Sequence, residues 1–253
     1  MGTKRKIWKL REKDILYVEE NHDGRYGAPG EKRKQKKKLT PEDVQRVNAW
    51  SKAKKAKLLL MEYFWTDGLW ATYTYKPENR PPDMATAQKH FRTAMGYLKK
   101  IYTKRGKQLF WIRNIEQGTK GAWHIHFVVN DIGDTASLIE RAWPHGGVYV
   151  TRINKDGCPE ENLKKLASYL TKDEKTKEEK KDGTPAKPRL RETSYSHSRN
   201  MPLPEPKPEK LKRWPKEIKP KKGYYIAESF EGINPVTGYK YRHYTMIKLD
   251  RRI

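Results

Sequence analysis

The chain lacks the features that mark secreted, membrane-spanning and thiolate-metal proteins. Cys158 is its only cysteine, which excludes an internal disulfide and a cysteine-rich zinc site. No apolar run approaches the roughly 18 residues that a membrane-spanning helix requires. The basic N-terminal segment leads into no apolar stretch, so we expect no signal peptide. These absences are typical of a protein from a reducing cytoplasm.

Two catalytic signatures are also missing. The phosphate-binding pattern G-x-x-x-x-G-K-[ST] does not occur, so we expect no ATPase or helicase domain. The pattern G-x-S-x-G does not occur either, which leaves a serine nucleophile on a strand–helix elbow without support.

Positive charge is what the sequence has in excess. Its 56 Lys and Arg residues against 31 Asp and Glu residues give a formal net charge of +25 at pH 7. Such an excess attracts a polyanion, and nucleic acid is the first candidate. An anionic membrane is the weaker alternative, because no long basic amphipathic helix with an aromatic face is present. The charge therefore predicts a nucleic-acid-binding protein that does not bind membranes.

The middle of the chain alternates between strand and helix patterns. Aromatic and β-branched runs predict strands, and apolar residues spaced three and four apart predict helices. The sequence predicts, in order, a strand at 68–75, a helix at 84–102, strands at 108–116 and 122–130, a short helix at 134–143, a strand at 146–153 and a helix at 159–175. The order is typical of a ferredoxin-like or RRM-like split βαβ arrangement. We therefore predict an α+β fold with a central antiparallel sheet of four to five strands, helices on one face and a C-terminal β-hairpin.

Composition divides the chain into five segments. Residues 1–39 are basic, lack periodicity and predict a flexible arm. Thr40, Pro41 and the acids that follow predict the start of a helix within 40–65. The split βαβ pattern occupies 66–175. Two segments follow it: a Lys/Glu/Pro-rich stretch at 176–222, which predicts a linker, and a terminal β-hairpin at 223–253.

The stretch "GAWHIHFVVN" (121–130) places two histidines one residue apart. Residues two apart on a strand point to one face, so His124 and His126 present both imidazoles to the same side. If the 117–121 loop closes a symmetric hairpin, residue 116 faces 122, 114 faces 124 and 112 faces 126. Glu116 then lies diagonally from His124 on the same face, whereas a one-residue slip would send it to the other face.

Two imidazoles and a carboxylate with open positions favour Mn²⁺ or Mg²⁺. The alternative is that His124 and His126 are ordinary polar residues on a half-exposed strand face. The histidine pair by itself supports the two interpretations equally, and Glu116 favours the metal.

Tyr169 lies on the helix predicted at 159–175, beside the apolar stripe rather than within it. Lys165 and Lys172 lie one turn before and one turn after it, on the same side. Two neighbouring cations are expected to favour the phenolate that a nucleophile needs. The alternative is an ordinary tyrosine of an amphipathic helix, whose ring packs against the core and whose hydroxyl is exposed to water. Among 15 tyrosines, that alternative is favoured for Tyr169 taken alone.

Three motifs occur in order: "TYTY" (72–75), "HIH" (124–126) and "YLTK" (169–172). In this combination residues 66–175 resemble the HUH endonuclease family. More narrowly, they resemble the one-tyrosine rolling-circle replication initiators (Rep proteins) of bacterial plasmids and phages. "TYTY" stands where that family has its strand-borne first motif, "HIH" is the His-hydrophobe-His motif, and "YLTK" matches the family's Tyr-x-x-Lys.

The resemblance implies a nicking and joining domain with assigned roles. His124 and His126, with Glu116, would ligate Mn²⁺ or Mg²⁺. Tyr169 would attack the scissile phosphate of a single-stranded origin hairpin, and Lys172 would position the tyrosine or the phosphate. The product would be a 5′-phosphotyrosine and a free 3′-OH that primes replication, and the reverse attack would rejoin the DNA. A host helicase and a polymerase of a bacterial cytoplasm would be its partners.

Three further basic residues are expected to contact DNA. Lys165 flanks Tyr169, and Arg113 precedes the histidine motif on the neighbouring strand. Arg199, in "SHSRNMPLP", is a candidate clamp on the DNA backbone, although that segment is more simply interpreted as linker.

Other functions fit some of the same residues. A transposase or a small conjugative relaxase would use the same site. A non-catalytic RRM-like nucleic-acid binder would keep its histidines for structure and would stack bases on the aromatic residues of "LFWI" and "TYTY". A basic ribosome-associated protein is a weaker alternative that the net charge permits.

Overall fold

The computed structural model describes residues 3–22, 40–153, 159–172, 190–233 and 239–249, with the backbone alone for residues 159–161. Cys158 and parts of four predicted segments therefore lie outside the described residues: 1–39, 66–175, 176–222 and 223–253. The chain forms two compact units, one of residues 49–202 and one of residues 1–48 with 203–253. No helix in these described ranges is long and apolar enough to cross a membrane.

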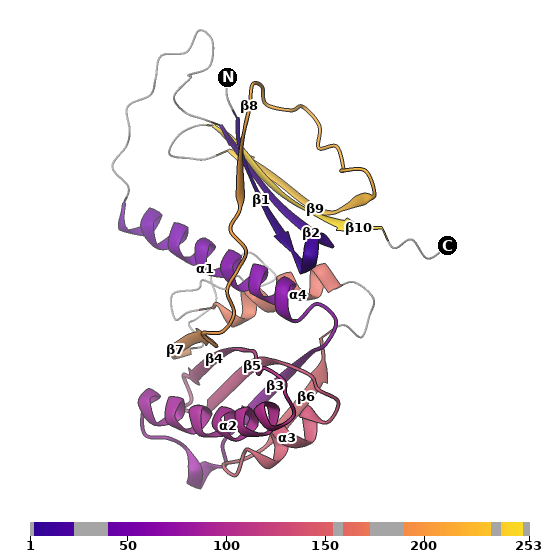
Figure 1. Cartoon of the computed structure of the whole chain (residues 1–253). Coiled ribbons are helices and arrows are strands. Elements are labelled where there is room, and N and C mark those ends of the chain that lie inside the picture. The colour runs from indigo at the N-terminus through magenta and orange to yellow at the C-terminus, as the bar shows by residue number, and fades with distance from the viewer. Residues whose placement is uncertain (1–2, 23–39, 154–158, 173–189, 234–238, 250–253) are drawn as a thin grey trace. The chain divides into compact units, whose positions relative to one another are not determined.

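The unit of residues 49–202 is built on a five-stranded antiparallel sheet with the strand order β6-β3-β5-β4-β7 (Figure 1). Its strand β5 lies between β3 and β4, which is the split βαβ arrangement. The α+β fold class is therefore confirmed. The elements are β3 (Gly68–Thr74), α2 (Met84–Lys104), β4 (Trp111–Gly118), β5 (Trp123–Asn130), α3 (Thr135–Arg141), β6 (Val148–Arg152), α4 (Pro159–Leu170) and β7 (Leu190–His197).

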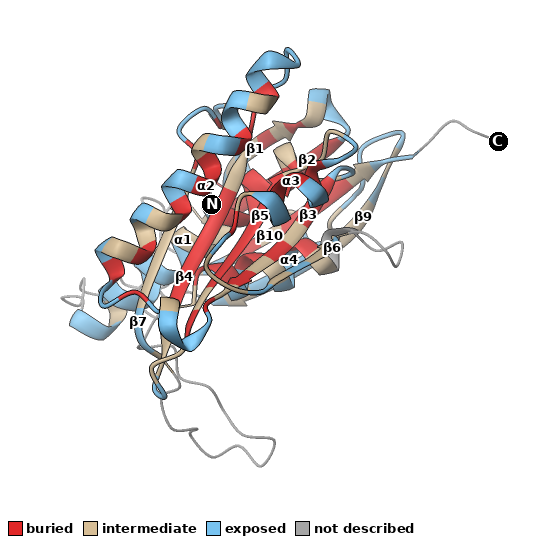
Figure 2. Ribbon diagram, turned by 90° about the horizontal axis from the view of Figure 1, so that it is seen from below, coloured by how far each residue is buried: buried red, intermediate tan, exposed pale blue. Residues whose placement is uncertain are grey.

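The main core lies on one face of this sheet. Alternate residues of the strands, such as Tyr73 and Phe127, pack against the buried side of α2 and against α3. Strands β4 and β5 are buried over most of their length, while α2 has one buried and one exposed side (Figure 2). The ring of Tyr73 also stacks on Trp143 with centroids 4.1 Å apart and planes 4° apart. This packing fixes which strand residues point to the opposite face.

The prediction that the helices share one face is correct for α2 and α3 but wrong for α4. Tyr169 of α4 contacts His126, whose side chain points away from the α2 and α3 core. Figure 1 shows α4 on the other side of the sheet from α2 and α3. The amphipathic pattern of α4 specifies that one side of the helix is buried, but it does not specify which sheet face buries it.

Gly146 allows the chain before β6 to run close beside the end of β3. A Cβ at this position would lie 2.2 Å from the carbonyl oxygen of Thr74 and 2.8 Å from the Cα of Tyr75. In α2, by contrast, a Cβ on Gly96 would meet no atom within 4 Å. The two glycines therefore differ in how much room a side chain would have.

Gly146→Ala is expected to lower the free energy of unfolding by about 1–3 kcal/mol, because the new methyl group overlaps backbone atoms. Gly96→Ala is the matched control, and it should raise that free energy by about 0.5–1 kcal/mol, because alanine costs less conformational entropy within a helix. Urea unfolding of both variants measures the difference. Equal effects on stability would contradict the close approach at Gly146.

The second unit also contains a five-stranded antiparallel sheet, with the order β8-β1-β2-β10-β9. The strands are β1 (Thr3–Leu10), β2 (Ile15–His22), β8 (Lys207–Leu211), β9 (Tyr224–Ile233) and β10 (Lys240–Lys248). The predicted C-terminal hairpin, β9 and β10, is confirmed. The predicted flexible arm is wrong for residues 3–22, and the predicted linker contains β7 and β8.

The hairpin of β1 and β2 escapes prediction because its turn contains no glycine. Arg11, Glu12 and Lys13 have φ values of 46°, 53° and 83°, a backbone region that L-residues other than Asn and Asp seldom adopt. Lysine and arginine also alternate with the inward residues of β1 and give the segment the composition of a solvated arm. Helix α1 (Pro41–Tyr63) begins as predicted, because the Asp43 N–H donates to Thr40 Oγ1 at 3.1 Å.

Candidate active site

The hairpin of β4 and β5 brings Glu116 directly opposite His124, and Asn114 directly opposite His126. The predicted register is therefore wrong by two residues, but the predicted face is correct because side chains alternate with a period of two. The shift arises at the turn, where the Gly118 N–H donates to the Ala122 carbonyl at 2.8 Å. The hairpin thus closes one residue later than expected.

His126 is the centre of the polar cluster on this face. Its Nδ1 lies 3.0 Å from Thr72 Oγ1 on β3, and its Nε2 lies 3.1 Å from the Tyr169 hydroxyl on α4. Burial, and then the neighbouring His124, lower the pKa of His126 to about 4. The ring is therefore neutral at pH 7, with one nitrogen donating a hydrogen bond and the other accepting one.

Glu116 lies beside this histidine in a nearly water-free position. Its Oε1 accepts a hydrogen bond from Asn114 Nδ2 at 2.9 Å, and its Oε2 lies 3.9 Å from His126 Nε2. Burial raises the pKa of Glu116, while Lys172 and the Asn114 hydrogen bond act in the opposite direction. Lys172 is thus close enough to stabilise the carboxylate electrostatically, as a residue of the same site would.

The donor atoms on this face suit a divalent cation, although they do not converge. The His124 ring lies 5.9 Å from the His126 ring at an angle of 16°, and it points to the same face as Glu116. Within the described part of the chain, no three His, Cys, Asp or Glu side chains lie close enough together to hold a metal ion. One buried oxygen there, Asn114 Oδ1, has no hydrogen-bond partner among the described residues. Amide and carboxylate oxygens with imidazole nitrogens are ligands that Mn²⁺ and Mg²⁺ accept.

Tyr169 reaches the cluster from the flank of α4. Leu163, Ala167 and Leu170 are buried, whereas Tyr169 is 40% exposed, as its position beside the stripe predicts. Its ring meets the rings of His126 and Trp70 edge-on, at centroid distances of 5.1 and 5.6 Å. Tyr169 is therefore held by three contacts, one polar and two aromatic.

The prediction that Lys165 and Lys172 favour the phenolate of Tyr169 is wrong for the protein without a bound ligand. Burial, and then the charge of Glu116, raise the pKa of Tyr169 to about 12. Lys165 and Lys172 do not reverse this effect. The hydroxyl thus stays protonated near pH 7 until further positive charge comes close to it.

A cavity of about 330 Å³ opens beside the tyrosine, and Trp70, Arg152, Lys165 and Tyr169 are among the residues that line it. Its size is in the range that takes a small ligand or a nucleotide. The predicted proximity of Lys165 to Tyr169 is confirmed. Arg152 adds a second cation to the cavity wall, and Trp70 adds an aromatic surface.

Comparison with known families bears on this part of the chain. Residues 68–174 match the family model described as Replication-associated protein ORF2/G2P. No curated protein and no solved structure gives a significant match to the chain. The match supports a function in replication initiation, as the sequence motifs predict. It contains every residue of the cluster around His126.

The stretch that matches the replication-associated family also contains Arg113, but that residue is not part of the site. Arg113 points to the opposite face, where it is buried, donates to the Ser194 carbonyl at 2.6 Å and lies over the Phe91 ring. Burial lowers its pKa to about 10. This buried position does not support the predicted contact of Arg113 with DNA. The Arg113 side chain instead links β4 to β7 and α2.

Arg199 lies outside the matched stretch and is exposed. Its neighbours Ser198 and Asn200 bind the backbone of Trp111 and Leu109, at the end of β4 away from Glu116. The structure therefore does not bring Arg199 to the cluster, and its contact with DNA stays a prediction.

The contacts of Trp70 and Thr72 with His126, and of Asn114 with Glu116, were not predicted, although Thr72 belongs to the motif "TYTY". The signal was present, because Trp70 and Thr72 are two apart on one strand, and Asn114 and Glu116 are two apart on another. Residues with this spacing share a face. The register that sets them against His126 was the missing information.

Proposed function

We propose that the unit of residues 49–202 nicks and rejoins single-stranded DNA at a replication origin through a 5′-phosphotyrosine intermediate. The observation that carries the proposal is the hydrogen bond between the Tyr169 hydroxyl and His126 Nε2 at 3.1 Å. It joins the tyrosine of "YLTK" to the histidine motif, 43 residues earlier in the chain. The match to a replication-associated family over the same residues supports this function.

In the proposed reaction the phenolic oxygen of Tyr169 attacks phosphorus. The Tyr–O–P bond forms as the P–O3′ bond breaks, and the leaving O3′ takes up the proton that the phenol gives up. Lys172 and Lys165 would balance the charge that develops on the phosphate oxygens. Attack of a 3′-OH on the phosphotyrosine would reverse the step and rejoin the strand without ATP.

A divalent ion would be held by His124, His126 and Glu116, with the Asn114 amide oxygen as a further ligand candidate. Bound there, Mn²⁺ or Mg²⁺ would act as a Lewis acid on a phosphate oxygen. Nε2 has one lone pair, so His126 cannot ligate an ion and accept the Tyr169 proton at the same time. Tyr169 would therefore leave Nε2 and become free to turn toward a phosphate.

The proposed substrate is an origin hairpin with an exposed single strand. Trp70 offers an aromatic surface for an unstacked base beside the cations of the cavity. A host helicase would unwind the duplex, and the freed 3′-OH would serve a polymerase. A transposase or small relaxase would use the same chemistry on a different DNA end.

The proposed function is tested with pooled single-stranded oligonucleotides and Mn²⁺, followed by a denaturing gel. We expect a protein–DNA band that survives denaturation, together with a free fragment that ends in a 3′-OH. A non-catalytic RRM-like binder would shift the DNA on a native gel and leave no denaturation-resistant band. That outcome with a demonstrated origin sequence would refute the nicking proposal.

Glu116→Ala is expected to weaken Mn²⁺ binding by roughly 10- to 100-fold, the usual cost of losing a ligand or its orienting partner. Titration calorimetry measures the dissociation constant. Glu192→Ala is the control, because Glu192 is an exposed carboxylate on the neighbouring strand β7. Equal affinities for the Glu116→Ala variant and the unmodified protein would remove Glu116 from the ligand set.

A further inference from the structure

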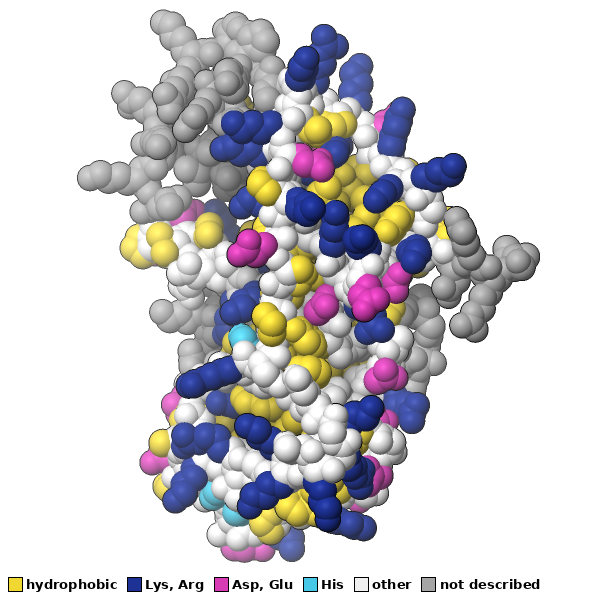
Figure 3. Space-filling model, in the orientation of Figure 1, with side chains coloured by type: hydrophobic (Ala, Val, Ile, Leu, Met, Phe, Trp, Pro, Cys, Tyr) yellow, Lys and Arg dark blue, Asp and Glu magenta, His cyan; other side chains and the backbone are white. Residues whose placement is uncertain are grey.

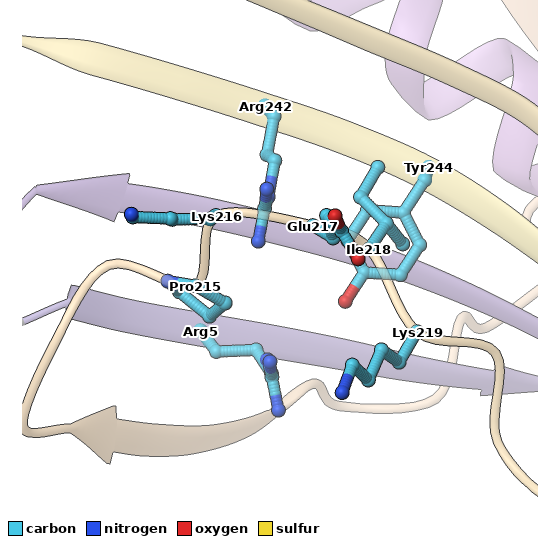
Figure 4. A pocket seen from close by; sticks show the side chains of 8 residues that line it. All are labelled: Arg5, Pro215, Lys216, Glu217, Ile218, Lys219, Arg242 and Tyr244. Atoms are coloured by element: carbon cyan, nitrogen blue, oxygen red, sulfur yellow. The ribbon is translucent and has the colours of Figure 1, made fainter.

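A basic cavity lies within the smaller unit, between its sheet and the segment that follows β8. It has a volume of about 590 Å³, and its walls come from β1, β10 and residues 215–219 (Figure 4). Four of the eight lining residues are cations and one is an acid: Arg5, Lys216, Lys219, Arg242 and Glu217. The cavity is therefore positively charged.

The fully buried carboxylate of Glu20 binds three of the side chains that line the cavity. Glu20 accepts hydrogen bonds from Arg5 Nε at 2.7 Å, from Arg242 Nε at 2.5 Å and from the Tyr244 hydroxyl at 3.1 Å. The side chain of Arg242 is 1% exposed and that of Glu20 is 0% exposed. Two guanidiniums are thus fixed in place by a single negative charge.

The remaining charge of the guanidiniums is only weakly compensated. Arg5 Nη1 lies 3.6 Å from Glu209, and Arg242 Nη1 lies 4.0 Å from Glu231. Both carboxylates are over 40% exposed, where solvent screens such pairs. Buried charge favours a well-placed counter-charge, so an anion in the cavity would be stabilised.

The side chains in the cavity are arranged to receive an anion. Figure 4 shows Arg242, the Tyr244 hydroxyl and Lys219 pointing into a common space near Arg5, while Lys216 points away from it. Arginine forks match the oxygens of a phosphate, and ammonium groups add charge with less directional demand.

An aromatic cluster lies beside these cations. The guanidinium carbon of Arg242 is 4.9 Å from the centroid of the Trp214 ring, and His22 stacks on the same ring at 4.8 Å and 12°. Segment 212–222 carries six cations against the single acid Glu217. Figure 3 shows Lys and Arg side chains spread over the visible surface of the chain. A cavity lined by cations, an aromatic surface and a basic segment together are typical of nucleic-acid binding.

We propose that this cavity is a second nucleic-acid site, which binds one backbone phosphate of a DNA strand between Arg5, Arg242 and Lys219. Trp214 would contact the adjoining nucleotide. The site goes beyond nicking and does not depend on Tyr169. A free nucleotide or inorganic phosphate has the same anionic chemistry, so the test must separate these sources from a DNA strand.

The test measures DNA binding by the full chain in the Tyr169→Phe background, where no adduct can form, by fluorescence anisotropy at several salt concentrations. Lys219→Gln is expected to weaken binding roughly tenfold, as loss of a charge-assisted contact does. It should also lower the slope of log affinity against log salt by about 0.7 on a single strand or about 0.9 on a duplex. Lys212→Gln removes the same charge from the same segment outside the cavity, and it should leave both quantities unchanged.

Each alternative outcome contradicts the proposal. Equal losses in Lys219→Gln and Lys212→Gln would show diffuse attraction by the whole segment. Binding of inorganic phosphate or a mononucleotide that depends on Lys219, with oligonucleotide binding that does not, would make the cavity a small-anion site. Thermal unfolding verifies that both variants are folded. DNA cleavage is measured in a separate experiment with Tyr169 intact. A negative result for the cavity therefore does not contradict the proposed nicking activity.

Discussion

Tyr169→Phe is expected to abolish the covalent protein–DNA adduct while the protein stays folded. The substitution removes the only oxygen of the side chain and keeps the ring that contacts Trp70 and His126. Loss of a catalytic nucleophile lowers turnover by at least about 10³-fold, whereas loss of one hydroxyl hydrogen bond costs about 1 kcal/mol of stability. Adduct yield on denaturing gels and the midpoint of urea unfolding measure the two effects.

Tyr149→Phe is the matched control. Tyr149 lies on β6 opposite Thr72, on the same face of the sheet, and it is 63% exposed. The control should form adduct at the rate of the unmodified protein. If Tyr169→Phe still forms adduct and Tyr149→Phe does not, the nucleophile has been assigned to the wrong tyrosine.

The largest expected effect on stability lies at Glu20 of the smaller unit. Glu20→Ala leaves the buried guanidinium of Arg242 without its counter-charge, and breaking a buried ion pair in this way costs about 3–5 kcal/mol. Glu209→Ala removes a half-exposed carboxylate 3.6 Å from Arg5, and surface pairs of this kind contribute about 0–1 kcal/mol. Urea unfolding of both variants compares the two free energies.

A double variant separates the loss of the pair from the cost of an orphaned charge. Glu20→Leu with Arg242→Met removes both partners and leaves apolar side chains of similar size. It should be less destabilised than the sum of the two single variants, because neither charge is left buried alone. Additive losses would show that the two residues do not act as a pair.

The sequence predicted the elements of the larger unit up to α4, because hydrophobic period and turn residues are local properties, but it did not predict β7, which lies in the segment predicted as a linker. It also placed Glu116, His124 and His126 on one face. Side chains alternate with a period of two along a strand, so a register error of two residues leaves each side chain on the same face. The sequence did not show that Glu116 lies opposite His124, because the turn, and not the strands, sets that register.

The features that escaped prediction depend on contacts distant in the sequence. The hairpin of β1 and β2 pairs with β8 and β10, each more than 180 positions away along the chain, and no local pattern encodes that pairing. The burial that raises the pKa of Tyr169 also comes from packing and not from its own helix. Lys165 and Lys172 are neighbours of Tyr169 in sequence, but burial, and then the charge of Glu116, determine the raised pKa of Tyr169.

The most direct test of the account identifies the residue that carries the DNA. The adduct is digested with nuclease and trypsin, and the peptides are sequenced by mass spectrometry. We expect a single nucleotide-bearing peptide, LASYLTK (166–172), with the 5′ phosphate on Tyr169. A nucleotide on any other residue, or cleaved DNA with no linked peptide, would contradict the assignment of Tyr169 as the nucleophile.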